Sequence, residues 1–98
     1  MAHDWTFLTN HAHVLLAVAR DPNLRLRDIA DLVGITERTA VGIVSDLEDE
    51  GYIRRVKVGR RNSYVLNPDQ PLRHPLESHH EVGQLLAAIG HSFSSDAG

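Results

Sequence analysis

Two glycines, Gly34 and Gly51, divide the centre of the chain into short segments whose apolar residues repeat with different periods. Before Gly34, apolar residues recur at helical spacing over residues 27–33, and glycine is a common C-terminal cap of helices. Between the glycines, the apolar residues of 36–50 again follow a helical period, which predicts a helix with one buried face. Thr36 is its expected N-cap, because threonine side chains accept hydrogen bonds from backbone N–H groups there. Two short helices joined by a tight turn are therefore expected at the centre of the fold.

After Gly51 the pattern changes to that of strands. Residues 52–58 are rich in β-branched and aromatic residues, residues 59–62 contain turn formers, and residues 63–66 return to a strand-like composition. We expect a β-hairpin whose tip carries arginines. Asn62 is the expected turn residue that tolerates a positive φ angle.

The flanking segments complete the expected fold. Asn10 is a candidate N-cap for a first helix over residues 10–20, which Pro22 and its neighbours would end because proline disfavours continuation of a helix. Alternating apolar and basic residues at 24–26 suit a very short strand. The expected organisation is an N-terminal lead-in (1–9), one domain (10–66), a proline-rich linker (67–75), a C-terminal amphipathic helix (76–90) and a flexible tail (91–98).

Size and composition restrict the class of protein. The chain of 98 residues and 10.9 kDa has room for one domain. It contains no cysteine, which excludes disulfides, thiolate nucleophiles and cysteine-ligated zinc. Its longest uncharged apolar run, residues 14–19, is far shorter than the roughly 20 residues of a membrane helix, and residues 1–4 lack the basic residues of a signal peptide. We therefore expect a soluble, cytoplasmic protein that binds no membrane.

The charges are distributed unevenly along the chain. The net charge is −3, which by itself argues against a nucleic-acid-binding protein, because such domains are usually basic. Residues 51–64, however, contain five basic residues and no acidic one, and nine of the ten basic residues of the chain are arginine. The planar guanidinium group binds phosphate and guanine through two parallel hydrogen bonds, which lysine cannot form. The net charge of the whole chain therefore conceals a cationic segment that is suited to DNA.

Three motifs in this part of the chain resemble those of winged helix-turn-helix transcriptional regulators of the broad MarR/ArsR group. IADLVGIT resembles their helix-glycine-threonine turn, IVSDLEDEGYIRR the end of their recognition helix, and VGRRNSYVL their β-hairpin wing. A wider likeness to short bacterial regulators, with WTFLTNH near the start and LNPDQPLRHP after the wing, covers about residues 5–90. The resemblance implies an α+β, mostly α fold with a three-helix core, a β-hairpin wing and an added C-terminal helix.

The resemblance also implies a function, namely sequence-specific binding of double-stranded DNA by a transcriptional regulator that acts as a homodimer. In a helix-turn-helix the second helix, here residues 36–50, enters the major groove with its N-terminal residues toward the bases. Arg38 is the best candidate for a guanine contact, and the wing tip at 59–62 would reach the minor groove or the backbone. The expected DNA-binding residues are Thr36, Glu37, Arg38, Thr39, Gly42, Arg60, Arg61, Asn62, Arg27 and Lys57.

Some of the basic residues also have simpler interpretations. Arg60 and Arg61 could be solvated charges at the tip of a hairpin. For Arg54 and Arg55 a structural role is the stronger interpretation, because the acidic residues 48–50 could form salt bridges with them.

An apolar stripe near the end of the chain is the candidate dimerisation surface. Its members are Val82, Leu85, Leu86 and Ile89. Such a stripe either covers the core or pairs with the same stripe of a second chain. Because regulators of this group are usually homodimers, the resemblance favours pairing.

Seven histidines raise the question of a metal site. His80 and His91 have the separation found in metal-sensing members of the group, but positions 78 and 94 are serine where those members have acidic ligands. The chain also lacks the sequence motifs of serine hydrolases, zinc proteases and nucleotide-binding enzymes. We expect no metal, no cofactor and no enzymatic activity.

Two other functions stay open at this point. A winged-helix module that binds another protein would fit the net charge of −3, the acidic Glu37 on the groove-facing helix and the missing side chain at Gly42. A small repressor that responds to a ligand or a metal would have to bind its effector between the terminal helices and the core. The sequence identifies no such effector.

Overall fold

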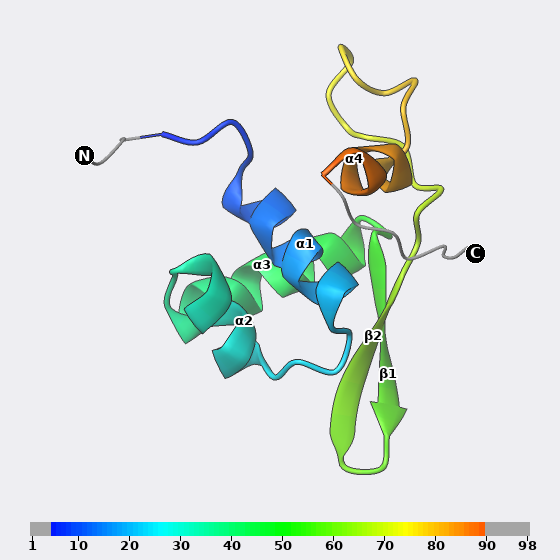
Figure 1. Cartoon of the computed structure of the whole chain (residues 1–98). Coiled ribbons are helices and arrows are strands. Elements are labelled where there is room, and N and C mark those ends of the chain that lie inside the picture. Colours follow the sequence, from blue (N-terminus) through cyan, green and yellow to red (C-terminus); the bar gives the residue numbers. More distant parts are fainter. Residues whose placement is uncertain (1–4, 90–98) are drawn as a thin grey trace.

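The computed structural model describes residues 5–89, which form helices and one β-hairpin (Figure 1). In chain order the elements are α1 (Asn10–Arg20), α2 (Leu26–Val33), α3 (Glu37–Asp49), β1 (Ile53–Val58), β2 (Arg61–Leu66) and α4 (Val82–Ala88). The expected fold class is confirmed, because three helices form the core, two antiparallel strands form the wing and a further helix follows. The tail expected at 91–98 lies outside the described residues.

Capping residues account for the boundaries of the first three helices. Thr9, and not Asn10 as predicted, is the N-cap of α1, and its side chain accepts a hydrogen bond from a backbone N–H group at 3.2 Å. Gly34 ends α2 with φ 86°, the left-handed conformation that glycine adopts without steric cost. Thr36 caps α3 as predicted, since its hydroxyl accepts from the Thr39 backbone N–H at 3.1 Å. Local signals therefore place the turn between α2 and α3.

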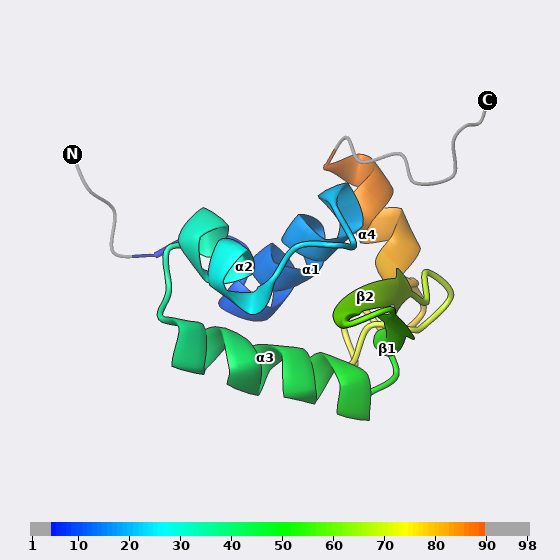
Figure 2. The same ribbon diagram turned by 90° about the horizontal axis from the view of Figure 1, so that it is seen from below.

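The core lies where α1, α2 and α3 meet, and α4 closes it. The largest side chains that are fully buried come from all four helices: Val14, Val18, Ile29, Val44 and Leu86. Burial of one such side chain stabilises the fold by about 1.5–3 kcal/mol. Figure 2 shows that α1 and α2 cover one side of α3, whereas its opposite side forms an edge of the molecule.

The hairpin has a tighter turn than the sequence suggested. β1 and β2 pair along their whole length, and only Gly59 and Arg60 lie between them. Gly59 has φ 63°, and a positive φ at the first position is required by one class of two-residue hairpin turns. The prediction that Asn62 belongs to the turn is wrong. Asn62 lies in β2 opposite Lys57, and within residues 5–89 only glycines have a positive φ.

Residues 24–26 do not form the predicted strand, because α2 begins there. The Asp28 carboxylate accepts hydrogen bonds from the backbone N–H and the Nε of Arg25, both at 3.3 Å, and so caps the first turn of α2. The side-chain hydrogen bond from Arg25 lowers the pKa of Asp28. The connection before α2 still contacts the wing, since the Tyr64 backbone N–H donates to the Pro22 carbonyl at 3.0 Å.

α4 is shorter than the helix predicted over 76–90, because residues 75–79 form turns and Glu81 is extended. Glu81 has φ −98° and ψ 154° and forms a β-bridge with Pro71, so no helix can begin earlier. The end predicted at residue 90 lies outside the described residues. The segment expected to be a linker is attached to the domain, since the Tyr52 hydroxyl donates to the Pro71 carbonyl at 2.7 Å. Burial raises the pKa of Tyr52, which keeps this donor protonated.

Two glycines within helices have opposite surroundings. The Gly83 backbone N–H donates to the Pro68 carbonyl at 2.9 Å, and a Cβ at position 83 would lie 2.8 Å from Pro68 Cβ and 2.9 Å from that carbonyl oxygen. A Cβ at Gly42 in α3 would meet no atom within 4 Å. The close approach of α4 to residues 67–70 therefore depends on glycine at 83, whereas the fold does not require glycine at 42.

We expect the same substitution to have opposite effects at these two positions. Gly83→Ala forces α4 away from Pro68 and lowers the free energy of unfolding by about 1–3 kcal/mol, as overpacking does. Gly42→Ala raises it by about 0.5–1 kcal/mol, because alanine loses less conformational entropy in a helix. Urea denaturation followed by circular dichroism measures both, and a Gly83→Ala variant as stable as the unsubstituted chain would contradict the prediction.

Candidate nucleic-acid interface

The outer face of α3 presents the side chains that the sequence assigned to the major groove. Thr36, Glu37, Arg38, Thr39 and Gly42 are all exposed. They lie at the N-cap and in the N-terminal half of the helix, and α1 and α2 lie along only one side of α3 (Figure 2). This half of α3 can therefore enter a groove without any change in the core.

The exposed residues of α3 differ in whether their side chains form contacts within the fold. The Thr36 hydroxyl accepts from the Thr39 backbone N–H and donates to the Thr39 Oγ1 at 2.9 Å, so both threonines serve the helix cap. Glu37 lies in the first turn, where the helix dipole favours an acid. The Arg38 guanidinium forms no hydrogen bond or ion pair with any residue from 5 to 89. Arg38 is thus a free hydrogen-bond donor on this face.

The two arginines of the wing are in different positions. Arg60 lies in the turn, is exposed, and has no hydrogen-bonded or ionic partner in the described part of the chain. Arg61 begins β2, and its Nη2 donates to the Asn23 carbonyl at 3.3 Å, which attaches the wing to the connection between α1 and α2. Arg60 is therefore free for a ligand, whereas Arg61 has a structural contact that a ligand would share or replace.

The other basic residues also include one with a structural contact and several without an ion pair. The Arg55 Nη2 donates to the Glu48 Oε1 at 2.9 Å and joins β1 to α3, which confirms the structural interpretation for this residue. Arg54, Lys57 and Arg27 are exposed and form no ion pair within residues 5–89. Free cations are therefore present on β1 of the wing and at the start of α2.

Half of the predicted dimerisation stripe lies inside the chain's own core, which corrects the sequence interpretation. Val82 is 3% exposed and Leu86 is 1% exposed, so neither side chain can contact a second copy. Leu85 is half-buried and lines a cavity, and Ile89 is 52% exposed. α4 has too few turns to cover the core with one face and also to expose a complete apolar stripe to a second chain.

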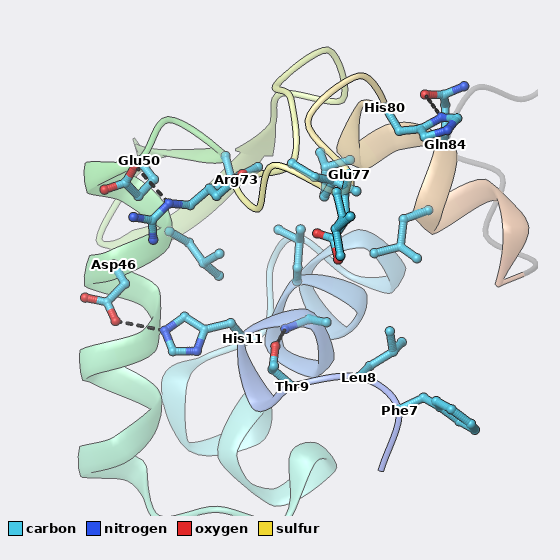
Figure 3. Close-up of a pocket in the computed structure, with 18 residues that line it drawn as sticks. Phe7, Leu8, Thr9, His11, Asp46, Glu50, Arg73, Glu77, His80 and Gln84 are labelled. Atoms are coloured by element: carbon cyan, nitrogen blue, oxygen red, sulfur yellow. Dashed lines mark hydrogen bonds and ion pairs between the residues drawn. The ribbon is translucent and has the colours of Figure 1, made fainter.

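A cavity of about 650 Å³ lies between the lead-in, α1, the C-terminal half of α3 and residues 72–85 (Figure 3). Its apolar lining includes Leu8, Leu15, Leu47, Leu72 and Val82. These residues come from segments that are far apart in the sequence. No motif spacing could therefore have identified this cavity, although a site between the terminal segments and the core was foreseen for an effector.

Three polar pairs surround the cavity in Figure 3. The His11 Nε2 lies 2.8 Å from the Asp46 Oδ2, and the Arg73 Nε lies 3.5 Å from the Glu50 Oε1. The third pair is formed by the His80 Nδ1 and the Gln84 Oε1 at 3.2 Å. One of these pairs involves Asp46 of α3 and another involves Glu50, the C-cap of α3, so the lining of the cavity is connected directly to the helix that carries Arg38.

The described residues contain neither a candidate metal site nor a candidate membrane span. Among residues 5–89, no three histidine, cysteine, aspartate or glutamate side chains are grouped closely enough to hold a metal ion. His91, one member of the histidine pair considered above, lies outside this range. No helix of the described chain is long and apolar enough to cross a bilayer.

The sequence of residues 5–61 matches the model of the MarR family. The uncharacterized protein MJ1254 of Methanocaldococcus jannaschii is 27% identical over 66 residues, which cover 66% of this chain and 14% of that protein. The chain therefore corresponds to a small part of this relative.

The structure is also similar to that of PcaV, a transcriptional regulator from Streptomyces coelicolor that was crystallised in complex with its natural ligand. The TM-score is 0.54 and the sequence identity is 27%, and the match covers 92% of this chain and 62% of PcaV. Nearly the whole of the present chain thus corresponds to somewhat less than two thirds of PcaV.

Proposed function

The chain belongs to the MarR family, and from this premise we propose that it is a transcriptional regulator, not an enzyme, that binds double-stranded DNA. It recognises specific sequences as a homodimer, with α3 in the major groove and the wing on the minor groove or the backbone. Its place of action is the cytoplasm, where the DNA lies.

The observation that carries this proposal is the uncovered outer face of α3 with Arg38 exposed on it. Within residues 5–89 no acidic side chain pairs with this guanidinium group, so it can donate two hydrogen bonds to the O6 and N7 atoms of a guanine. Arg60 at the tip of the wing supports a second contact, because basic side chains enter narrow minor grooves. Four acidic residues follow from 46 to 50, at the C-terminal end of α3 and its C-cap, and would repel phosphate. The N-terminal half of α3 is therefore the part that we place in the groove.

Exposed apolar side chains support a second copy of the chain as partner. Phe7 is 92% exposed, Leu76 is 81% exposed, and Trp5 and Ile89 are also exposed, although all four are large and apolar. Single apolar residues on a surface are normal, but four large exposed side chains in the segments before α1 and from residue 76 to 89 favour an interface. A two-fold dimer would place the two α3 helices in half-sites about 10 bp apart or a multiple of that distance.

The first experiment mixes the purified chain with sheared genomic DNA at about 0.15 M salt, which is physiological ionic strength, and sequences the retained fragments. We expect a few fragments that share an inverted repeat. Arg38→Ala should weaken binding to the recovered site by about 1–3 kcal/mol, because a bidentate base contact is lost. Arg60→Ala should weaken binding to all DNA and reduce the slope of log affinity against log salt by about 1, as the loss of one phosphate contact does.

Arg20→Ala is the matched control, because it removes the same charge from the end of α1, outside α3 and the wing. Its effect on binding should be small. Equal losses for all three variants would mean that only the net charge matters, and the proposed contacts would be rejected. If no DNA is retained at all, a winged-helix module that binds another protein becomes the better interpretation.

A response to a small molecule is a second candidate function, and the cavity favours it. A volume of about 650 Å³ lies within the range of about 300–1,000 Å³ that is usual for ligand sites. Asp46 and Leu47 of α3 and its C-cap Glu50 line this cavity, so a bound molecule would touch the helix that we place in the groove. The similar regulator PcaV binds a natural ligand, which agrees with such a role.

Ala12→Phe tests the ligand response, because Ala12 lines the cavity and a phenyl ring there would fill part of it. Thermal denaturation of the unsubstituted chain with a set of small aromatic acids and amines should identify compounds that raise Tm by mass action. The same compounds should change the affinity for the recovered DNA site and should lose both effects on the Ala12→Phe variant. A compound that acts equally on both proteins would show that it binds elsewhere.

A further inference from the structure

One apolar side chain on the outer face of α3 has no function in the fold. Val41 is 47% exposed, and the buried side of the helix is formed by Ala40, Ile43, Val44 and Leu47 instead. Arg38 and Ser45, which are exposed as well, lie three residues before and four residues after Val41 and therefore share its side of the helix. Valine is also a weaker helix former than alanine or leucine, since its branched Cβ restricts χ1. Neither core packing nor helix propensity explains a valine at this position.

The neighbouring residue, Gly42, has no function in the fold either. A Cβ there would meet no atom within 4 Å, and the backbone is ordinary helix without a positive φ. Glycine in a helix interior costs about 0.5–1 kcal/mol relative to alanine. What glycine does provide is a flat backbone surface next to Val41, which allows close approach by another molecule. Two adjacent residues that are unfavourable for the isolated domain thus lie one turn after the exposed Arg38.

The chemistry of the major groove supplies a reason for both residues. Thymine alone among the four bases presents a methyl group there, and apolar side chains recognise it by direct contact. We propose that Val41 contacts the 5-methyl group of a thymine, and that Gly42 allows α3 to lie close enough to the base edges for this contact. The inference rests on the proposed DNA-binding function and adds a specificity determinant to it. Each half-site then contains a preferred thymine next to the base pair that Arg38 contacts.

The test begins with in vitro selection of the full chain on a pool of random duplexes. Each thymine of the selected half-site is then replaced by deoxyuridine, which removes only the 5-methyl group and leaves all hydrogen-bonding atoms in place. For the unsubstituted chain, we expect replacement of one thymine per half-site to weaken binding about three- to fivefold, the effect of losing one buried methyl contact. Replacement of the other thymines should change the affinity much less.

Variants of the protein identify the side chain that makes the contact. Val41→Ala should bind the thymine and the deoxyuridine duplexes with nearly equal affinity. Val41→Thr keeps one methyl group on Cβ and should retain part of the preference. Val65→Ala is the matched control, because Val65 is a valine of similar exposure, 44%, on β2, and it should keep the full preference for thymine.

The outcomes distinguish failure of the proposed DNA-binding function from failure of the contact by Val41. If the pool yields no enriched sequence, the proposed DNA-binding function fails. If sequences are enriched but contain no thymine whose methyl group matters, DNA binding stands and the contact by Val41 is rejected. The contact is also rejected if Val41→Ala keeps the preference of the unsubstituted chain for thymine over deoxyuridine.

Discussion

The rest of the structure depends on the burial of one face of α3 against α1 and α2. Ala40, Ile43, Val44 and Leu47 form this face, and each is nearly or completely removed from solvent. Burial of the larger ones stabilises the fold by about 1.5–3 kcal/mol each, which is far more than any surface contact in the molecule. Rotation of α3 about its axis would expose this face, so the outer face is held toward solvent. The packing that stabilises the domain therefore also presents Arg38.

Two polar side-chain pairs connect the C-terminal half of α3 with its surroundings. The His11 Nε2 of α1 is hydrogen-bonded to the Asp46 Oδ2 beside the cavity, and Glu48 forms an ion pair with Arg55 of β1 at the base of the wing. Exposed pairs of this kind contribute at most about 1 kcal/mol each, so they orient the neighbouring elements more than they stabilise the fold. The two halves of α3 consequently differ in their surroundings. The C-terminal half borders the cavity and contacts the wing, and the N-terminal half is exposed on its outer face.

How far the sequence predicted this arrangement depends on how local each signal is. The turn between α2 and α3 was predicted correctly, because Gly34 and Thr36 act on backbone groups within a few residues of themselves. Asn62 was misplaced because pairing with β1 extends β2 to Arg61, and this pairing outweighs the turn preference of asparagine. The start of the last helix was placed too early because the bridge to Pro71 holds Glu81 extended. In both wrong predictions a contact between separate segments overrode a local preference.

The sequence by itself determined the helical period of α3, its inner face and the number of arginines after Gly51, because these follow from residue types and short spacings. Only the tertiary structure decided which arginines are free, since the contact of Arg61 with Asn23 joins residues 38 positions apart. It also decided that Val82 and Leu86 belong to the core, whereas Ile89 remains exposed. An apolar stripe can be buried against any apolar surface of suitable shape, and a periodic pattern does not specify which surface covers it. The cavity likewise exists only once segments from both ends of the chain have been brought together around α3.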